Sequence, residues 1–81
     1  MNIFDAIKKA GQTKKILQIV YKKKDGTTSS RHIEPYELRD GKLFAWDISK
    51  DDHIRQFFIT GILQAEVIED SDFTPRYPVK V

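Results

Sequence analysis

The apolar residues of this chain change from a helical period to a period of two near Gly11, and this change limits the folds open to it. Residues 2–11 carry apolar side chains at the spacing of one helix face: Ile3, Phe4, Ile7 and Ala10. Asn2 can cap such a helix, and Gly11 is expected to stop it. The stripe predicts a short helix docked on the rest of the fold.

Beyond Gly11, short runs rich in β-branched and aromatic residues alternate with turn signals, as in antiparallel strands. Asp25-Gly26 and Asp40-Gly41 are typical of tight hairpin turns. Pro35 is expected to close the second strand, because proline cannot donate to a strand ladder. The expected strands are residues 15–22, 28–33, 42–47, 53–59 and 62–69.

One helix followed by five short antiparallel strands predicts a mainly β fold, a small and partly open barrel of the SH3-like or Sm-like kind. A chain of 81 residues is expected to form a single domain over residues 1–81. Within it we expect a helix over 2–11, a barrel over 14–70 and an extended tail over 71–81. Phe73 and Tyr77 in the tail either fold back on the barrel or dock on a second copy.

The sequence lacks the signals of an enzyme. It has no cysteine, which excludes disulfides, thiolate zinc sites and cysteine nucleophiles. It has no HExxH, GxSxG, Walker or GxGxxG motif, and His32 and His53 have no third metal ligand at a suitable spacing. No apolar run has the length of a membrane span, and no secretory signal begins the chain. We therefore expect a cytoplasmic protein without catalytic activity, cofactor, metal or membrane partner.

The net charge of +2 is unevenly distributed. Residues 1–42 hold ten basic against five acidic residues, a balance of +5, and residues 43–81 hold four against seven, a balance of −3. A basic first half can attract phosphates. A solvated, lysine-rich surface that keeps the protein soluble explains the same charge.

Two arginines lie within predicted strands and share a face with apolar residues. Arg31 precedes Ile33 by two residues, and Arg55 precedes Phe57 by two, so in a strand each arginine points to the same face as that apolar residue. Two interpretations remain open. In the first, the arginines pair with carboxylates such as Glu34 or Asp47. In the second, their guanidinium groups offer paired N–H donors to a phosphate or carboxylate on a concave, aromatic-lined surface.

The order of several short motifs resembles a WYL domain. Ile19-Val20-Tyr21, then Gly26, then Ser30-Arg31-His32-Ile33-Glu34-Pro35 is similar to the opening of that family, I-x-Y, G and s-x-R-x-[VI]-x-P. Leu43-Phe44-Ala45-Trp46-Asp47 is similar to its L-x-A-Y-D strand, and Ile54-Arg55-Gln56-Phe57 to its R-x-F motif. The resemblance covers roughly residues 15–70. Where the family usually carries two further arginines, this chain has Phe58 and Gly61.

The resemblance implies a non-enzymatic module that senses a negatively charged ligand, a nucleotide or a single-stranded nucleic acid, through a basic and aromatic surface. Such modules commonly regulate a DNA-binding or enzymatic neighbour, including transcription regulators, and standalone members are expected in phage or bacteria. Trp46 could stack a base or pack in the core. The candidate ligand-binding residues are Arg31, Arg55, Tyr21, His32, Trp46 and Phe57.

The alternative to a ligand-sensing module is an assembly module, with a protein partner or a homo-oligomer, that uses the barrel edge and the tail and binds no nucleic acid.

Overall fold

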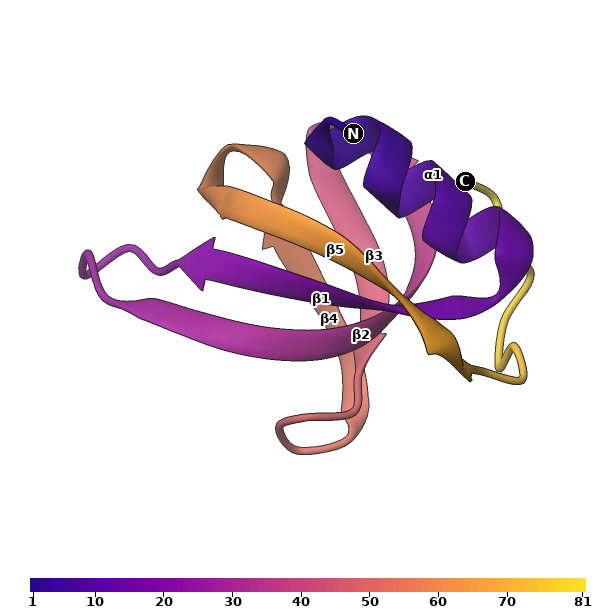
Figure 1. Ribbon diagram of the computed structural model, residues 1–81. Helices are drawn as coiled ribbons and strands as arrows, with labels where there is room; N and C mark the ends of the chain where they lie inside the picture. The colour runs from indigo at the N-terminus through magenta and orange to yellow at the C-terminus, as the bar shows by residue number, and fades with distance from the viewer.

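The predicted strands form one antiparallel sheet with the predicted helix packed across it, in a computed structural model that describes all residues 1–81 (Figure 1). The elements are α1 (Ile3–Thr13), β1 (Lys15–Lys22), β2 (Thr28–Arg39), β3 (Lys42–Asp47), β4 (His53–Phe58), the 3₁₀ turn η1 (Ile59–Gly61) and β5 (Ile62–Asp72). The strand order is β4-β3-β2-β1-β5. The expected mainly β fold with an N-terminal helix is confirmed.

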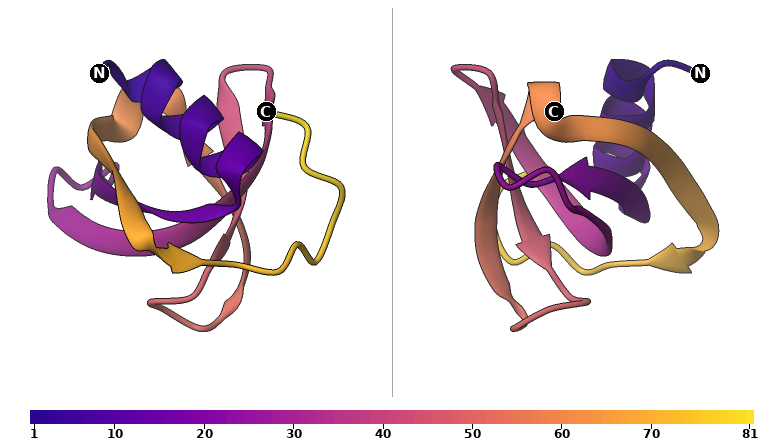
Figure 2. Two further views of the ribbon diagram at one scale, coloured as in Figure 1. Left: turned by 45° about the vertical axis from the view of Figure 1, so that its right-hand side comes forward. Right: turned by 90° about the vertical axis from the view of Figure 1, so that its left-hand side faces the viewer.

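The sheet curls because β2 is long enough to have different neighbours along its length. Its first part pairs with β1 as far as Leu17↔Ile33, and its second part pairs with β3 from Ile33↔Asp47 to Arg39↔Lys42. Figure 2 shows the curled sheet, with α1 packed on β1, β2 and β5. β4 and β5 are the two edges of the sheet, joined by η1, so the barrel is partly open.

The core fills the concave face of this sheet. Side chains alternate between the two faces of a strand, so cross-strand partners such as Leu17 and Ile33, or Leu43 and Phe57, share the inner face. The buried apolar core consists of Ala6, Ile7, Ala10, Leu17, Ile19, Ile33, Leu43, Ala45, Phe57 and Ile62. Ile3, Ile7 and Ala10 of the predicted stripe face this core, but the prediction for Phe4 is wrong: Phe4 is 50% exposed, and Ala6 is buried in the helix face instead.

The prediction that α1 stops at Gly11 is wrong. The helix continues to Thr13 and is capped by Lys14, whose left-handed backbone (φ 58°) directs its N–H to the carbonyl oxygen of Ala10. Gly11 is buried, and a Cβ at this position would lie 1.9 Å from Cγ2 of Val81. The glycine leaves room for the end of the tail and does not terminate the helix.

The prediction that Pro35 closes the second strand is also wrong, because β2 runs through it to Arg39. β1 pairs with β2 no further than Ile33, so Pro35 lies where β2 has lost one of its two neighbours. The register with β3 also shifts between Pro35 and Glu37. Proline is tolerated at sheet edges and bulges, where its missing N–H breaks no ladder bond.

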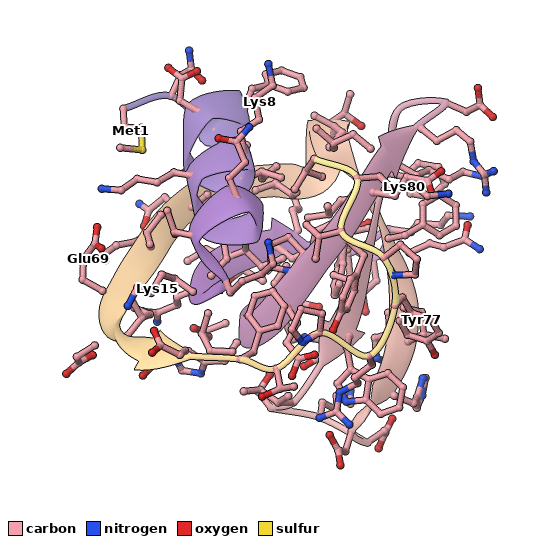
Figure 3. The ribbon with its side chains drawn as sticks, turned by 90° about the vertical axis from the view of Figure 1, so that its right-hand side faces the viewer. Met1, Lys8, Lys15, Glu69, Tyr77 and Lys80 are labelled. Atoms are coloured by element: carbon pink, nitrogen blue, oxygen red, sulfur yellow. The ribbon has the colours of Figure 1, made fainter.

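The tail folds back over the outer face of the sheet. β5 extends to Asp72, which pairs with Lys15, so the irregular tail begins at Phe73. The Lys80 N–H donates to the carbonyl oxygen of Tyr36 at 2.7 Å, and Figure 3 shows Lys80 and Tyr77 along the tail on this side of the molecule. The rings of Phe73 and Tyr77 both meet Tyr36 edge-on.

No helix of the structure combines the length and apolar character needed to cross a membrane.

Tyr36 is the anchor of the tail. Its hydroxyl donates to Oε1 of Glu34 at 2.6 Å and accepts the backbone N–H of Arg76 at 2.9 Å. The Arg76 side chain reaches the same carboxylate, with Nε 3.1 Å from Oε1. Burial of the phenol and its hydrogen bond to Glu34 raise the pKa of Tyr36 to about 12.

The high pKa of Tyr36 predicts a loss of stability in alkali. The neutral phenol stabilises the fold fully below the unfolded pKa of about 10, and this contribution is lost as the pH rises from there toward 12. Tyr36→Phe should remove this step and lower the free energy of unfolding at neutral pH by about 1–3 kcal/mol, since buried Glu34 loses a donor. Denaturant unfolding against pH, with absorbance of the phenolate, measures both effects. Tyr77→Phe is the control and should change neither, because the Tyr77 ring is 43% exposed.

Candidate ligand-binding site

Arg31, Asp47 and Arg55 meet on the concave face of the sheet, where adjacent strands bring them together. Arg31 lies opposite Ile19 of β1, Asp47 opposite Ile33 of β2, and Arg55 opposite Ala45 of β3. Arg31 Nη1 donates to Oδ2 of Asp47 at 2.6 Å, and Arg55 Nε lies 3.6 Å from the same oxygen. The shared face predicted for the two arginines is therefore present.

Asp47 is the centre of this cluster. Its side chain is fully buried, and its Oδ1 accepts hydrogen bonds from the backbone N–H and the hydroxyl of Ser49 and from the backbone N–H of Lys50. Burial by itself raises the pKa of Asp47, but the hydrogen bonds from Ser49 and Arg31 outweigh it and hold the pKa below its usual value. The carboxylate therefore stays charged beside the two guanidinium groups.

Both arginines already have carboxylate partners. Arg31 is 6% exposed and bound to Asp47, while Arg55 donates from Nη2 to Oδ2 of Asp51 at 2.5 Å. Of the two carboxylates weighed from sequence, Asp47 is the partner, and Glu34 pairs with Arg76 instead. A ligand anion at these arginines would have to compete with their carboxylate partners, and their predicted role in ligand binding stays a prediction.

Tyr21 and Phe57 accompany the arginines on the concave face. The rings of Tyr21 and Phe57 are 5.1 Å apart and edge-on, and the Arg31 guanidinium lies 6.0 Å from the Phe57 centroid. Phe57 is buried in the core. The Tyr21 hydroxyl reaches across to β4 and accepts the backbone N–H of Phe58 at 3.0 Å. Tyr21 thus links the arginine cluster to the rim of the barrel.

His32 and Trp46 lie on the other face of the sheet. His32 is exposed, and its backbone N–H donates to the hydroxyl of Ser49 at 3.1 Å. Trp46 Nε1 donates to Oδ1 of Asp52 at 2.7 Å, and the Arg76 guanidinium lies 4.3 Å from the Trp46 ring. The structure therefore separates these two candidates from Arg31 and Arg55 by the thickness of the sheet.

A basic hollow that the sequence reasoning did not assign lies at the end of the β1–β2 hairpin. It has a volume of about 240 Å³. Its lining residues are Tyr21, Lys22, Lys23, Lys24, Phe58, Thr60 and Gly61. The Phe58 ring is 46% exposed, and Lys42 Nζ lies 5.7 Å from its centroid. The signal in the sequence is the lysine run beside the Asp25-Gly26 turn.

Gly61 permits the close packing that shapes this hollow. A Cβ on Gly61 would lie 2.7 Å from Cε1 of Tyr21 and 3.1 Å from the carbonyl oxygen of Lys22. A larger residue would displace the Tyr21 ring from its place beside Phe57. The turn η1 therefore needs a glycine here for space.

No group of three or more histidine or acidic side chains gathers in a way that could hold a metal ion.

Comparison with known protein families shows to which family the chain belongs. A model of the WYL domain matches residues 2–67, from the start of α1 into β5. The chain belongs to the WYL domain family. No curated protein matches it. WYL domains are regulatory, ligand-sensing modules and are generally not catalytic.

This WYL domain differs from the family pattern at the basic hollow. Phe58 and Gly61, which stand where the family usually carries arginines, both line it. Lys22, Lys23 and Lys24 of the hairpin line the same hollow from the other side. The positive charge at this hollow comes from Lys22 at the end of β1 and from Lys23 and Lys24 in the turn that follows.

The buried carboxylate of this WYL domain predicts a strong effect of Asp47→Asn. The change leaves Arg31 buried without a charged partner, and we expect the free energy of unfolding to fall by about 3–5 kcal/mol. The lowered pKa gives Asp47 a stabilising effect that is present above its unfolded pKa of about 3.9 and is lost as the pH falls through the folded value. The variant should lack this acid-dependent part.

Denaturant unfolding between neutral and acid pH measures both quantities. Asp40→Asn is the matched control, since Asp40 is exposed and lies in the β2–β3 turn. Equal stability of the Asp47→Asn and Asp40→Asn variants would show that the cluster does not hold the sheet together.

Proposed function

We propose that this WYL domain is a non-enzymatic ligand-sensing module that binds a negatively charged ligand, a nucleotide or a single-stranded nucleic acid, at the basic hollow. The lysines of the hollow supply the charge, and the exposed ring of Phe58 supplies a surface for a base. Cytoplasmic location and control of a transcription regulator belong to the same proposal.

The contrast between free lysines and paired arginines carries this proposal. No carboxylate forms an ion pair with Lys22, Lys23 or Lys24, whereas Arg31 and Arg55 are paired within the fold. Cations without a fixed partner offer a phosphate their full attraction, because no internal ion pair has to break first.

The acidic side chain of the hairpin, Asp25, forms no ion pair with these lysines, although the charge of Lys23 acts on it. Asp25 accepts the hydroxyl and the backbone N–H of Thr27 at 2.7 and 2.9 Å. These two hydrogen bonds, and to a smaller extent the charge of Lys23, lower the pKa of Asp25, so one carboxylate stands against three lysines. The hollow therefore keeps a net positive charge.

The aromatic residues give the hollow a second mode of contact. Phe58 presents its ring beside Lys42, an arrangement that suits a base above the ring and a phosphate beside the amine. Tyr21 contributes the edge of its ring and connects the hollow to Phe57 and Arg31 below. In this proposal Phe57 and Arg31 lie behind Tyr21 and support the site, whereas Arg55, which pairs with Asp47 and Asp51, and His32 and Trp46 lie outside it.

The test compares two variants that remove the same charge. Lys22→Ala/Lys24→Ala removes cations from the hollow, and Lys8→Ala/Lys50→Ala removes exposed cations from α1 and the β3–β4 loop. A thermal-shift screen over nucleotides and short DNA and RNA single strands identifies binders, since a ligand of the native state raises the melting temperature. Titrations with the best binder at several salt concentrations then give the affinities.

We expect the hollow variant to bind more weakly than the native protein. For a single strand, the slope of the logarithm of the binding constant against the logarithm of the salt concentration should become shallower by about 0.7 per lysine removed. The surface control should bind almost as the native protein does. Phe58→Leu should cost about 1–3 kcal/mol of binding energy by removing the stacking surface. Absence of any binder in the screen, or equal weakening by both lysine variants, would contradict the proposal.

A further inference from the structure

A second concave surface lies on the outer face of the sheet and shares no lining residue with the basic hollow. This outer groove has a volume of about 350 Å³ and runs from the tail across β2 and β3 to β4. Its hydrophobic lining consists of Tyr36, Phe44, Ile54 and Tyr77, and Pro78 also lines it. Ile54 and Tyr77 are 41% and 43% exposed, so the groove presents apolar surface to solvent.

The groove opens beside the free edge of β4. The backbone N–H of Phe58 bonds to the Tyr21 hydroxyl, so it points away from β3. Alternation along an antiparallel ladder then turns the backbone groups of Ile54 and Gln56 toward the same free edge. The Ile54 carbonyl oxygen lies 2.7 Å from Nδ1 of His53, which leaves Gln56 in the middle of the edge open to a new strand.

The rim of the outer groove carries an excess of positive charge. Arg39 and Lys80 line it with side chains that are 61% and 64% exposed. Both rely on a single carboxylate, Glu37, at 3.4 Å from Arg39 Nε and 3.9 Å from Lys80 Nζ. Two cations that share one distant carboxylate attract a further acidic group.

We propose that the outer groove and the edge of β4 bind an extended acidic segment of a partner protein. The segment adds as a strand beside Gln56, places an apolar side chain between Phe44 and Ile54, and sets its carboxylates against Arg39 and Lys80. A peptide fits this surface better than a nucleic acid does. A peptide backbone can pair with the free strand edge through its N–H and C=O groups, whereas a sugar–phosphate backbone has no such groups to add to a strand.

This docking site goes beyond the proposed anion site and is tested separately. The full chain is panned against a display library of random linear peptides, and an enriched peptide is synthesised with a fluorescent label. We expect enriched sequences to combine acidic residues with an apolar anchor. Fluorescence anisotropy then gives the affinity of the labelled peptide for the native chain and its variants.

The decisive comparison uses two exposed apolar residues on opposite edges of the sheet. Ile54→Asp should weaken the peptide about tenfold or more, since it removes the apolar contact and repels the acidic segment. Leu63→Asp makes the same change on β5, where Leu63 is 49% exposed, and should leave the affinity unchanged. Both side chains face solvent, so equal melting temperatures of the two variants confirm intact folds.

Further measurements separate this site from the basic hollow. Lys80→Glu should weaken the peptide, whereas Lys22→Ala/Lys24→Ala should leave its affinity unchanged. Binding should also slow hydrogen exchange of the Gln56 amide, which a peptide lying only in the groove would not do. Lack of enrichment, enrichment of basic sequences, equal loss in the Leu63→Asp variant, or loss of oligonucleotide binding in the Ile54→Asp variant would each overturn the proposal.

Discussion

The ion pair between Arg31 and Asp47 joins β2 to β3 inside the barrel, and much of the structure depends on it. A fully buried carboxylate is costly unless charge and hydrogen bonds surround it, and here Arg31, Ser49 and Arg55 do so. Because these groups balance one another's charge, arginines can lie on the concave face beside the buried apolar core.

Tyr21 connects this core to the surface where a ligand is proposed to bind. Its ring packs on Phe57, and its hydroxyl holds the backbone of Phe58 across the open side between β1 and β4. A ligand in the basic hollow thus contacts a side chain that helps to close the barrel. Beyond Phe58, the edge of β4 continues toward Ile54 and the outer groove. β4 therefore contributes to both proposed binding surfaces, through Phe58 and Ile54.

The local pattern of the sequence was enough to predict the order of elements and the shared face of Arg31 and Arg55, because side-chain alternation is a property of each strand alone. The wrong predictions for Gly11 and Pro35 concern residues whose roles depend on distant parts of the chain. Gly11 is small because Val81 packs against it, and Pro35 is tolerated because β1 no longer pairs with β2 at that point. Neither cause is visible in neighbouring residues.

The basic hollow was missed for the same reason. The lysine run is plain in the sequence, but it becomes part of a concave site only where η1 brings Phe58 and Gly61 against the β1–β2 hairpin. By itself the sequence determined the mainly β fold, the faces of its strands and the family to which the motifs point. The tertiary structure decided that Asp47 and Asp51 pair with the two arginines and that the hairpin lysines form no ion pair. These outcomes depend on strand register and on contacts between distant segments, which local patterns do not encode.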